Sequence, residues 1–237
     1  MDTQPWILLA LIGLAVLVGL AAAVPRIQRI LRIRRTPTCT INALPYEGEV
    51  EISGTVGAPV SQSPITRTEC AYWQVEVKEE RSSGKSRTWH TIFKQSSDAV
   101  FQVQDGTGSA GVLPNDAVLV LNDDFQKSSG FLNALDAETL AAIQRLGVET
   151  TGFLGFKKSL KVTEKVIVPG DTIYVLGQVD TGSGAKVLQA AGRNSLIISD
   201  RSEQALLSGL YLEVALMILA VPAVIGFVVL ITYFQPK

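Results

Sequence analysis

Two long apolar runs, one near each end of the 237-residue sequence, constrain its fold more than any other feature. Trp6 to Val24 is a run of 19 residues without an ionisable side chain, and Val214 to Phe234 is a similar run of 21 residues. As a helix, the first run would cover about 28 Å, which is close to the hydrocarbon thickness of a bilayer. We therefore predict two transmembrane helices, within residues 1–25 and 205–237.

The second run is preceded by a carboxylate and interrupted by a proline. The apolar pattern starts at Ala205, so we expect a helix of about 30 residues with Glu213 near the membrane boundary and a kink at Pro222. A carboxylate inside a span is often functional. The run reaches full length without Glu213, however, so a hydrated residue at the boundary is the better interpretation.

A cluster of five arginines follows the first run and predicts the orientation in the membrane. The cluster comprises Arg26, Arg29, Arg32, Arg34 and Arg35. By the positive-inside rule, the residues after the first span should be cytoplasmic and both termini should lie outside. A cleaved signal peptide is the alternative, but Asp2 precedes the run and no basic residue does. We predict an integral two-span protein of an inner or plasma membrane, with residues 26–45 as a basic flank and linker.

The residues between the spans are acidic overall. The chain has 21 Lys+Arg and 22 Asp+Glu; without the five arginines, Lys237, Asp2 and Glu213, residues 36–204 keep 15 and 20, a net charge of −5. Such a domain repels anionic lipid and nucleic acid on average, although a local patch could still bind them. Nucleic acid is therefore not an expected partner.

The region 46–204 has the alternating pattern of half-buried strands. Period-two runs include Glu49 to Val56, Ala71 to Val77 and Thr88 to Phe93. One short helix is predicted from an Asp136 cap to Leu146, with Gly147 as its stop. Three strands, a helix and two further strands match an OB-like Greek-key barrel. The predicted fold is mainly β: an OB-like Greek-key barrel domain with one short helix, flanked by two transmembrane helices.

The sequence carries no convincing catalytic, cofactor or metal motif. Two cysteines and one histidine cannot supply the four ligands of a Cys/His zinc site. Gly106 to Gly111 matches G-x-G-x-x-G, but Val112 to Pro114 follow where a helix should begin, which favours a hairpin turn. No G-x-S-x-G motif accompanies His90. We therefore predict no catalytic residue, no metal and no cofactor.

A basic and aromatic stretch is the best candidate for a partner surface. Glu79 to Arg87 is a polar stretch typical of an exposed hairpin loop. Arg87 ends this stretch, and Trp89 and His90 follow in the next predicted strand, so the three residues form the possible partner surface. Arginine and tryptophan together could hold a single nucleic-acid strand by charge and stacking. The neighbouring glutamates weaken that hypothesis and favour a solvated hairpin.

The order of features along the chain resembles the GIDE family, the mitochondrial membrane-anchored ubiquitin ligases and their prokaryotic relatives. The resemblance covers both spans and the domain between them. The residues that carry it are Gly54, Val56, Cys70, Tyr72, Trp89, Phe101 to Gly108, Val112, Pro114, Glu164, Pro169-Gly170-Asp171, Leu176-Gly177, Asn194-Ser195-Leu196 and Ser199.

One departure from the family affects the expected function. In the ligases a RING domain follows the second span, whereas this sequence ends at Gln235-Pro236-Lys237. We therefore expect a non-catalytic, membrane-anchored interaction module, of bacterial or archaeal origin, that binds the bilayer and an unidentified membrane or cytoplasmic protein and could form a homo-oligomer. A ligase-related protein acting with a separate RING partner, and an OB-like binder of single-stranded nucleic acid, are the alternatives.

Overall fold

The computed structural model describes residues 5–58, 61–84, 86–129, 135–152, 157–182, 184–192 and 195–233. The chain forms two compact units. One unit contains Met1–Pro37 and Ser202–Lys237, and the other contains Thr38–Arg201. Asn194, Phe234 at the end of the second apolar run, and Gln235 to Lys237 lie outside the described residues.

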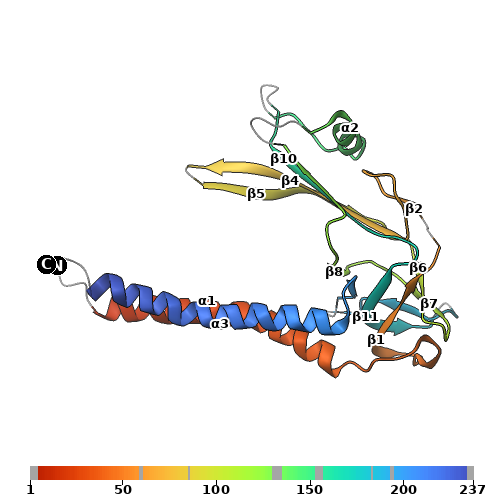
Figure 1. The fold of residues 1–237 in the computed structure, drawn as a ribbon, viewed down its shortest axis with the longest axis horizontal. Coiled ribbons are helices and arrows are strands. Elements are labelled where there is room, and N and C mark those ends of the chain that lie inside the picture. Colours follow the sequence, from red (N-terminus) through yellow and green to blue (C-terminus); the bar gives the residue numbers. More distant parts are fainter. Residues whose placement is uncertain are drawn as a thin grey trace. The chain divides into compact units, whose positions relative to one another are not determined.

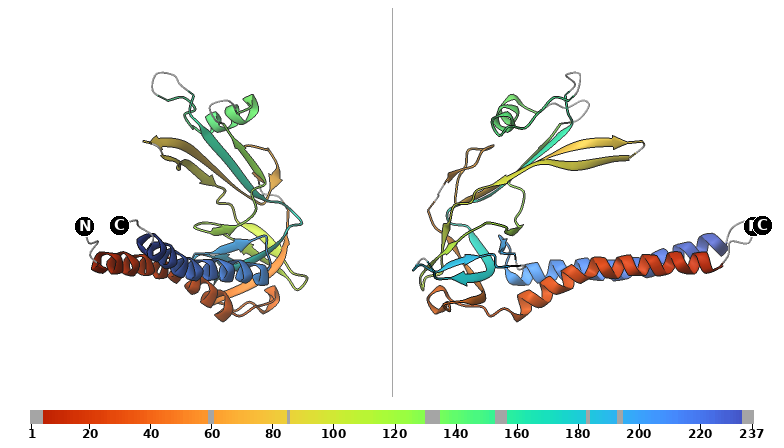
Figure 2. Two further views of the ribbon diagram at one scale, coloured as in Figure 1. Left: turned by 60° about the vertical axis from the view of Figure 1, so that its left-hand side comes forward. Right: turned by 180° about the vertical axis from the view of Figure 1, so that it is seen from behind.

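The first unit is a pair of long apolar helices, α1 (Pro5–Arg35) and α3 (Glu203–Tyr233), which lie side by side and antiparallel (Figure 1, Figure 2). Each contains a segment apolar and long enough to cross a bilayer, Ile12–Arg35 and Glu203–Ala220. Two candidate membrane helices therefore precede and follow the β domain, as the apolar runs predict.

The first helix is longer than the apolar run that predicts it. α1 continues from Val24 through Arg35, so residues 26–35 are helical, although we expected a flank and linker there. Arginine is a good helix former, and the positive charges of Arg32, Arg34 and Arg35 in the last turn favour the negative end of the helix dipole. These residues therefore extend the helix instead of ending it.

The second unit contains a closed five-stranded barrel, seen beside the label β11 in Figure 1. Its strand order is β1-β6-β7-β12-β11, and β11 pairs with β1 to close it. The pair β7–β12 is parallel, as in an OB-like Greek key, so the predicted barrel is confirmed. Its strands are β1 (Gly48–Val56), β6 (Phe101–Gln104), β7 (Ser109–Val112), β11 (Thr172–Asp180) and β12 (Val187–Gln189); β13 (Ile197–Ser199) and β8 (Val118–Val120) extend the sheet from β11.

The barrel interior explains the spacing of its apolar residues and one of its glycines. Alternate residues of β1, among them Val50 and Ile52, are buried with Phe101 and Val103 of β6 in one core. A Cβ atom at Gly54 would lie 2.7 Å from the Gln104 carbonyl oxygen and 2.7 Å from Val103 Cγ1. Only glycine therefore allows β1 and β6 to approach each other this closely.

A second, four-stranded sheet is built from segments inserted between barrel strands, in the order β5-β4-β10-β9 (Figure 1). It comprises β4 (Tyr72–Ser83), β5 (Ser86–Ser96), β9 (Phe125–Ser128) and β10 (Leu160–Ile167). The short strands β2 (Ser61–Gln62) and β3 (Glu69–Cys70) precede it, and the 3-10 turn Ile41–Ala43 precedes β1. The insertion explains why the hairpin β4–β5 does not belong to the barrel.

The predicted short helix is present and covers one face of this second sheet. Helix α2 (Ala137–Arg145) is capped by Asp136, whose carboxylate accepts a hydrogen bond of 2.9 Å from the Thr139 N–H. Ile143 is buried in a core with Val77 and Val162 of the sheet. The helix therefore belongs to the insertion and leaves the other face of the sheet uncovered by it.

The prediction of a loop over Glu79 to Arg87 is wrong. Strand β4 continues to Ser83, and β5 begins at Ser86, so the reversal is a tight turn at Gly84, whose φ is +60°. Polar side chains on both faces hide the alternation that would otherwise indicate a strand. The result is a long two-stranded ribbon in place of an exposed loop.

Candidate functional site

The uncovered face of the second sheet gathers most of the polar side chains of its strands. Directly paired residues of antiparallel strands share a face, and the pairs here include Gln74 with Lys165, Glu76 with Thr163 and Lys78 with Lys161. The intervening residues, such as Val75 and Val77, face the core beneath α2. We call this polar side the outer face.

Two of the three predicted partner-surface residues lie on the outer face, and the third does not. Trp89 pairs with Glu80, and Arg87 is two residues away, so both share the side of Lys78. His90 pairs with Glu79 and lies on the opposite side, where its ring contacts the Thr88 hydroxyl at 2.9 Å. Strand alternation thus divides a group that is continuous in the sequence.

The side chains of Trp89 and Arg87 are accessible. Trp89 is 43% exposed, the highest value for an aromatic ring in the described sheet strands. The Arg87 side chain is 70% exposed, and its Nη1 lies 3.8 Å from the Glu80 carboxylate. A surface ion pair of this length contributes little to stability, so the guanidinium remains available to a partner.

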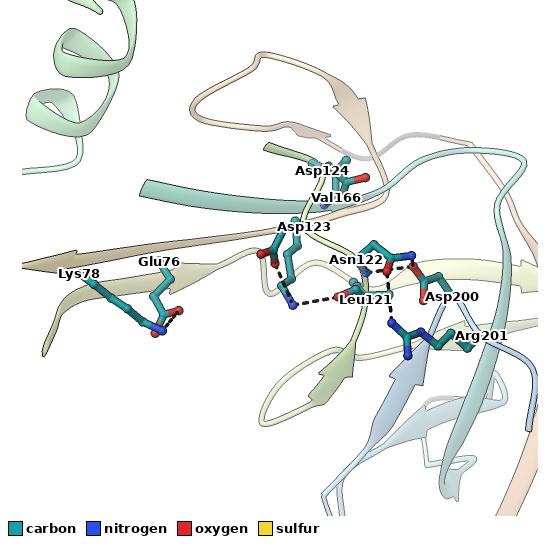
Figure 3. Close-up of polar contacts among 10 residues, drawn as sticks. Glu76, Lys78, Leu121, Asn122, Asp123, Asp124, Val166, Asp200 and Arg201 are labelled. Atoms are coloured by element: carbon teal, nitrogen blue, oxygen red, sulfur yellow. Dashed lines mark hydrogen bonds and ion pairs between the residues drawn. The ribbon is translucent and has the colours of Figure 1, made fainter. Parts of the chain in front are cut away.

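A hollow of about 200 Å³ lies on the same outer face, between β4, β10 and the segment before β9. The Lys78 ammonium lies 3.0 Å from the Glu76 carboxylate, and Lys165 lies 3.4 Å from Asp123 (Figure 3). The Lys161 side chain makes no hydrogen bond or ion pair with any residue that the structure describes. The hollow is lined by Gln74, Glu76, Lys78, Asp123, Lys161, Thr163 and Lys165.

The carboxylate of Glu76 is held in its ionised form. Partial burial by itself would raise the pKa of Glu76, but the hydrogen bond from Thr91 (2.8 Å) and the contacts with Lys78 and Lys94 hold it below its ordinary value. The ionised Glu76 offsets the charge of Lys78. The hollow therefore presents Lys161 as a cation without an ion-pair partner among the described residues.

The segment that leads into β9 joins the second sheet to the barrel sheet (Figure 3). Asn122 donates to the Asp200 carboxylate from its backbone N–H (3.0 Å) and its side-chain amide (2.8 Å). On the other side, the Asp124 carboxylate accepts from the Val166 N–H (2.8 Å), and Lys165 donates to the Leu121 carbonyl (2.9 Å). These acidic residues fix the crossing between the sheets, so they have structural partners.

A buried carboxylate holds the β2–β3 connection against the other side of the sheet. Glu164 is fully buried and accepts hydrogen bonds from the Ile65 N–H (2.8 Å), the Thr66 N–H (3.0 Å) and the Ser63 hydroxyl (3.1 Å). The alternation of β10 could have indicated that Glu164 is buried, because Glu164 occupies an inward position two residues after Val162. Its role in this fold is to organise a loop.

The two cysteines and the glycine-rich motif have structural surroundings. Cys39 is partly buried and Cys70 is buried, both as free thiols, and burial raises the pKa of the Cys70 thiol. Gly106 to Gly111 forms the β6–β7 hairpin predicted for it, with Asp105 accepting from the Thr107 N–H at 2.8 Å. Among the described residues, no three His, Cys, Asp or Glu side chains are grouped as metal ligands.

The arginine cluster and the boundary carboxylate meet in the helical pair. Arg26 Nε lies 3.2 Å from the Glu213 carboxylate, and Arg34 Nη1 donates to the Tyr211 hydroxyl at 3.4 Å. The remaining members Arg29, Arg32 and Arg35 lie on the same part of α1. The sequence pattern predicts that Arg26 and Glu213 lie near the membrane boundary but does not reveal their contact, because 187 positions separate them.

Comparison with protein families identifies the chain. A family model described as "GIDE: E3 Ubiquitin ligase" matches residues 73–231, which is more than half of the chain. The chain belongs to the GIDE family. The GIDE match covers the second sheet from Trp73 onward, four of the five barrel strands and all but the last two residues of α3, but not α1 or β1, so it is narrower than the resemblance that the sequence indicates.

The GIDE match begins within the second sheet. Trp89 and Glu164 lie inside it, whereas Gly54 and Cys70, which also carry the resemblance, precede it. No curated protein and no solved structure matches the chain. Membership in the GIDE family is therefore the conclusion that the comparisons support.

Proposed function

We propose that this protein is a membrane-anchored, non-catalytic interaction module of the GIDE family. Helices α1 and α3 would anchor it, and the outer face of the second sheet would bind a protein partner. The observation that carries the proposal is the exposed pair of Arg87 and Trp89 on a ribbon that no described element covers. Exposed tryptophan and arginine side chains are the residues most enriched at binding hot spots.

The charge distribution supports a cytoplasmic β domain. The five arginines lie at the end of α1, immediately before the β domain. Basic residues next to a span are retained on the cytoplasmic side. Both chain termini would then lie outside, because the two helices are antiparallel.

A photo-cross-linking experiment tests the proposed binding face. A benzophenone amino acid at position 89 should capture a specific protein in native membranes, whereas the same group at position 90, on the opposite side of β5, should capture it much less. Equal capture at the two positions, or capture of lipid alone at position 89, would contradict the proposal. Capture of a second copy of this chain alone would also contradict the proposal of a separate partner and would indicate a homo-oligomer.

The family description favours one second candidate, a ligase-related protein that acts through a separate RING partner. These 237 residues contain two cysteines and one histidine, too few for the zinc ligands of a RING, so in this candidate a separate RING partner supplies those ligands. Purified partner captured at position 89 should then transfer ubiquitin or a similar modifier in the presence of this chain. Capture of a partner without zinc-binding cysteines would exclude this candidate.

The barrel gives little support to nucleic-acid binding. In OB-folds the second and third strands form the binding face, and these correspond to β6 and β7 here. Their exposed side chains are Gln102, Gln104 and Ser109, none of which is aromatic or basic. Trp89 and Arg87 lie on the second sheet, so the stacking platform of the single-strand hypothesis is not on the barrel.

A further inference from the structure

Strand β5 is a free edge of the second sheet. It pairs with β4 on one side, and no described strand pairs with its other side. In an antiparallel pair, alternate residues of an edge strand direct their N–H and C=O groups away from the sheet. Such groups are a template for an additional strand.

The ribbon formed by β4 and β5 extends beyond its neighbour β10. The pairing of β10 with β4 ends at Leu160 opposite Glu79, with one further hydrogen bond from the Glu80 N–H to the Ser159 carbonyl (2.9 Å). From Arg81 to the turn, no strand among the described residues joins the two strands of the ribbon. A two-stranded ribbon is marginally stable in water, so a third strand would stabilise it.

Every residue of β5 from Ser86 to Thr91 is exposed, and this stretch is regular. The register shift opposite Val77 and Lys78 begins only after Thr91. A bulge is one way in which proteins protect an edge. In β5 the bulge protects the part of the strand after Thr91 and leaves the regular residues Ser86 to Thr91 open. About six residues are the usual length of a strand.

The outer face next to this edge is locally basic, although the domain as a whole is acidic. Cationic side chains outnumber carboxylates on it, and Lys161 has no described ion-pair partner. The face carries Lys78, Arg87, Lys94, Lys161 and Lys165 against Glu76, Glu80 and Asp123. Charge complementarity therefore selects an acidic partner.

We propose that the free edge of β5 binds an extended acidic segment of a partner protein as an added strand. A carboxylate of that segment would lie beside Arg87, and an apolar side chain two residues away on the same face would lie against Trp89. A bilayer surface offers no row of backbone groups to match the edge, so an extended protein segment fits it better than a membrane does. The inference rests on the proposed interaction function and specifies the chemistry of the partner.

Peptide binding to the full chain in phosphatidylcholine nanodiscs tests this inference. The probe is a labelled ten-residue peptide of alternating Glu and Thr with a central Phe, and the control replaces each Glu by Lys. We expect the acidic peptide to bind at least about tenfold more tightly than the control. Amide hydrogen exchange should slow in residues 86–91 when the acidic peptide is bound, because added-strand hydrogen bonds protect edge amides.

Matched variants separate the outer face from the opposite one. Arg87→Ser and Trp89→Ala should each weaken peptide binding about tenfold. Arg81→Ser and His90→Ala, on the opposite face of the same ribbon, should change it less than about twofold. Equal effects on the two faces would overturn the inference.

Three further outcomes would also overturn the inference. These are peptide binding without protection of 86–91, protection caused by phosphatidylserine nanodiscs in the absence of peptide, and protection that rises with the concentration of this chain alone. If the peptide does not bind but position 89 still captures a protein in native membranes, strand addition fails and the proposed function stands. If position 89 captures none, the proposed function fails.

Discussion

The barrel and the second sheet differ in whether their edge strands are paired. The barrel closes by pairing β1 with β11, so its five strands have no free edge. In the second sheet, α2 covers one face, and one edge of β5 has no pairing strand among the described residues. From this difference we propose that the barrel stabilises the domain and that the second sheet binds its partner.

A substitution in the barrel core should have the largest effect on stability. Phe101→Ala removes a ring with 0% exposure and should lower the free energy of unfolding by about 3–5 kcal/mol. The adjacent Val100 is 41% exposed, so Val100→Ala should change it by less than about 0.5 kcal/mol. Urea unfolding of the full chain in detergent, followed by near-ultraviolet circular dichroism, measures both. Similar losses would contradict the buried position of Phe101.

Loss of the buried carboxylate should destabilise the second sheet locally. Glu164→Gln places an amide NH₂ among N–H and O–H donors and should cost about 2–3 kcal/mol. Hydrogen exchange should rise first in residues 61–70, which Glu164 holds, while the barrel strands stay protected. An equal rise in β1 and β11 would show that the two regions unfold as one unit. Glu138→Gln, on the exposed side of α2, is the control.

A smaller effect is expected where β1 and β6 approach each other. Gly54→Ala introduces a Cβ atom 2.7 Å from backbone and side-chain atoms of β6, so we expect a loss of about 1–2 kcal/mol. At Gly57 the nearest atoms would be 3.5 Å away, and Gly57→Ala should be nearly neutral. Thermal unfolding of the two variants in the same detergent compares them. A neutral Gly54→Ala would show that the strands can separate without cost.

The smallest effect concerns a surface carboxylate of the β6–β7 hairpin. Hydrogen bonds from Thr107 and the Ile41 N–H lower the pKa of Asp105 to about 2, from an ordinary value of 3.8. Because the folded-state pKa is the lower one, the stabilisation is present above pH 3.8 and is lost as the pH falls toward 2. Wild type should therefore exceed Asp105→Asn in stability at pH 6, with the difference disappearing near pH 2. A difference that persists at pH 2 would contradict this assignment.

The same contrast explains what the sequence could and could not predict. The barrel strands alternate apolar and polar residues, as in Glu49 to Val56, so both their type and their OB-like order could be predicted. The ribbon could not, because Glu79 to Arg87 is polar on both faces and resembles a loop. Alternation separates Trp89 from His90, but which of the two lies on the outer face depends on pairing register, which one strand does not encode.

Contacts distant in sequence could not be predicted either. The pattern placed Arg26 and Glu213 at a membrane boundary, yet their pairing depends on the packing of α1 against α3. The four hydrogen bonds to Glu164 likewise arise from a loop some hundred residues earlier. Local patterns thus predict elements, and tertiary packing decides their partners.

Cross-linking from the two regions in native membranes tests the central claim most directly. One benzophenone amino acid replaces Trp89 on the ribbon, and another replaces Gln102 on the exposed side of the barrel. We predict that a specific partner protein is captured from position 89 and not from position 102. Capture from the barrel alone, or equally from both positions, would contradict the division of the domain into a stabilising barrel and a binding sheet.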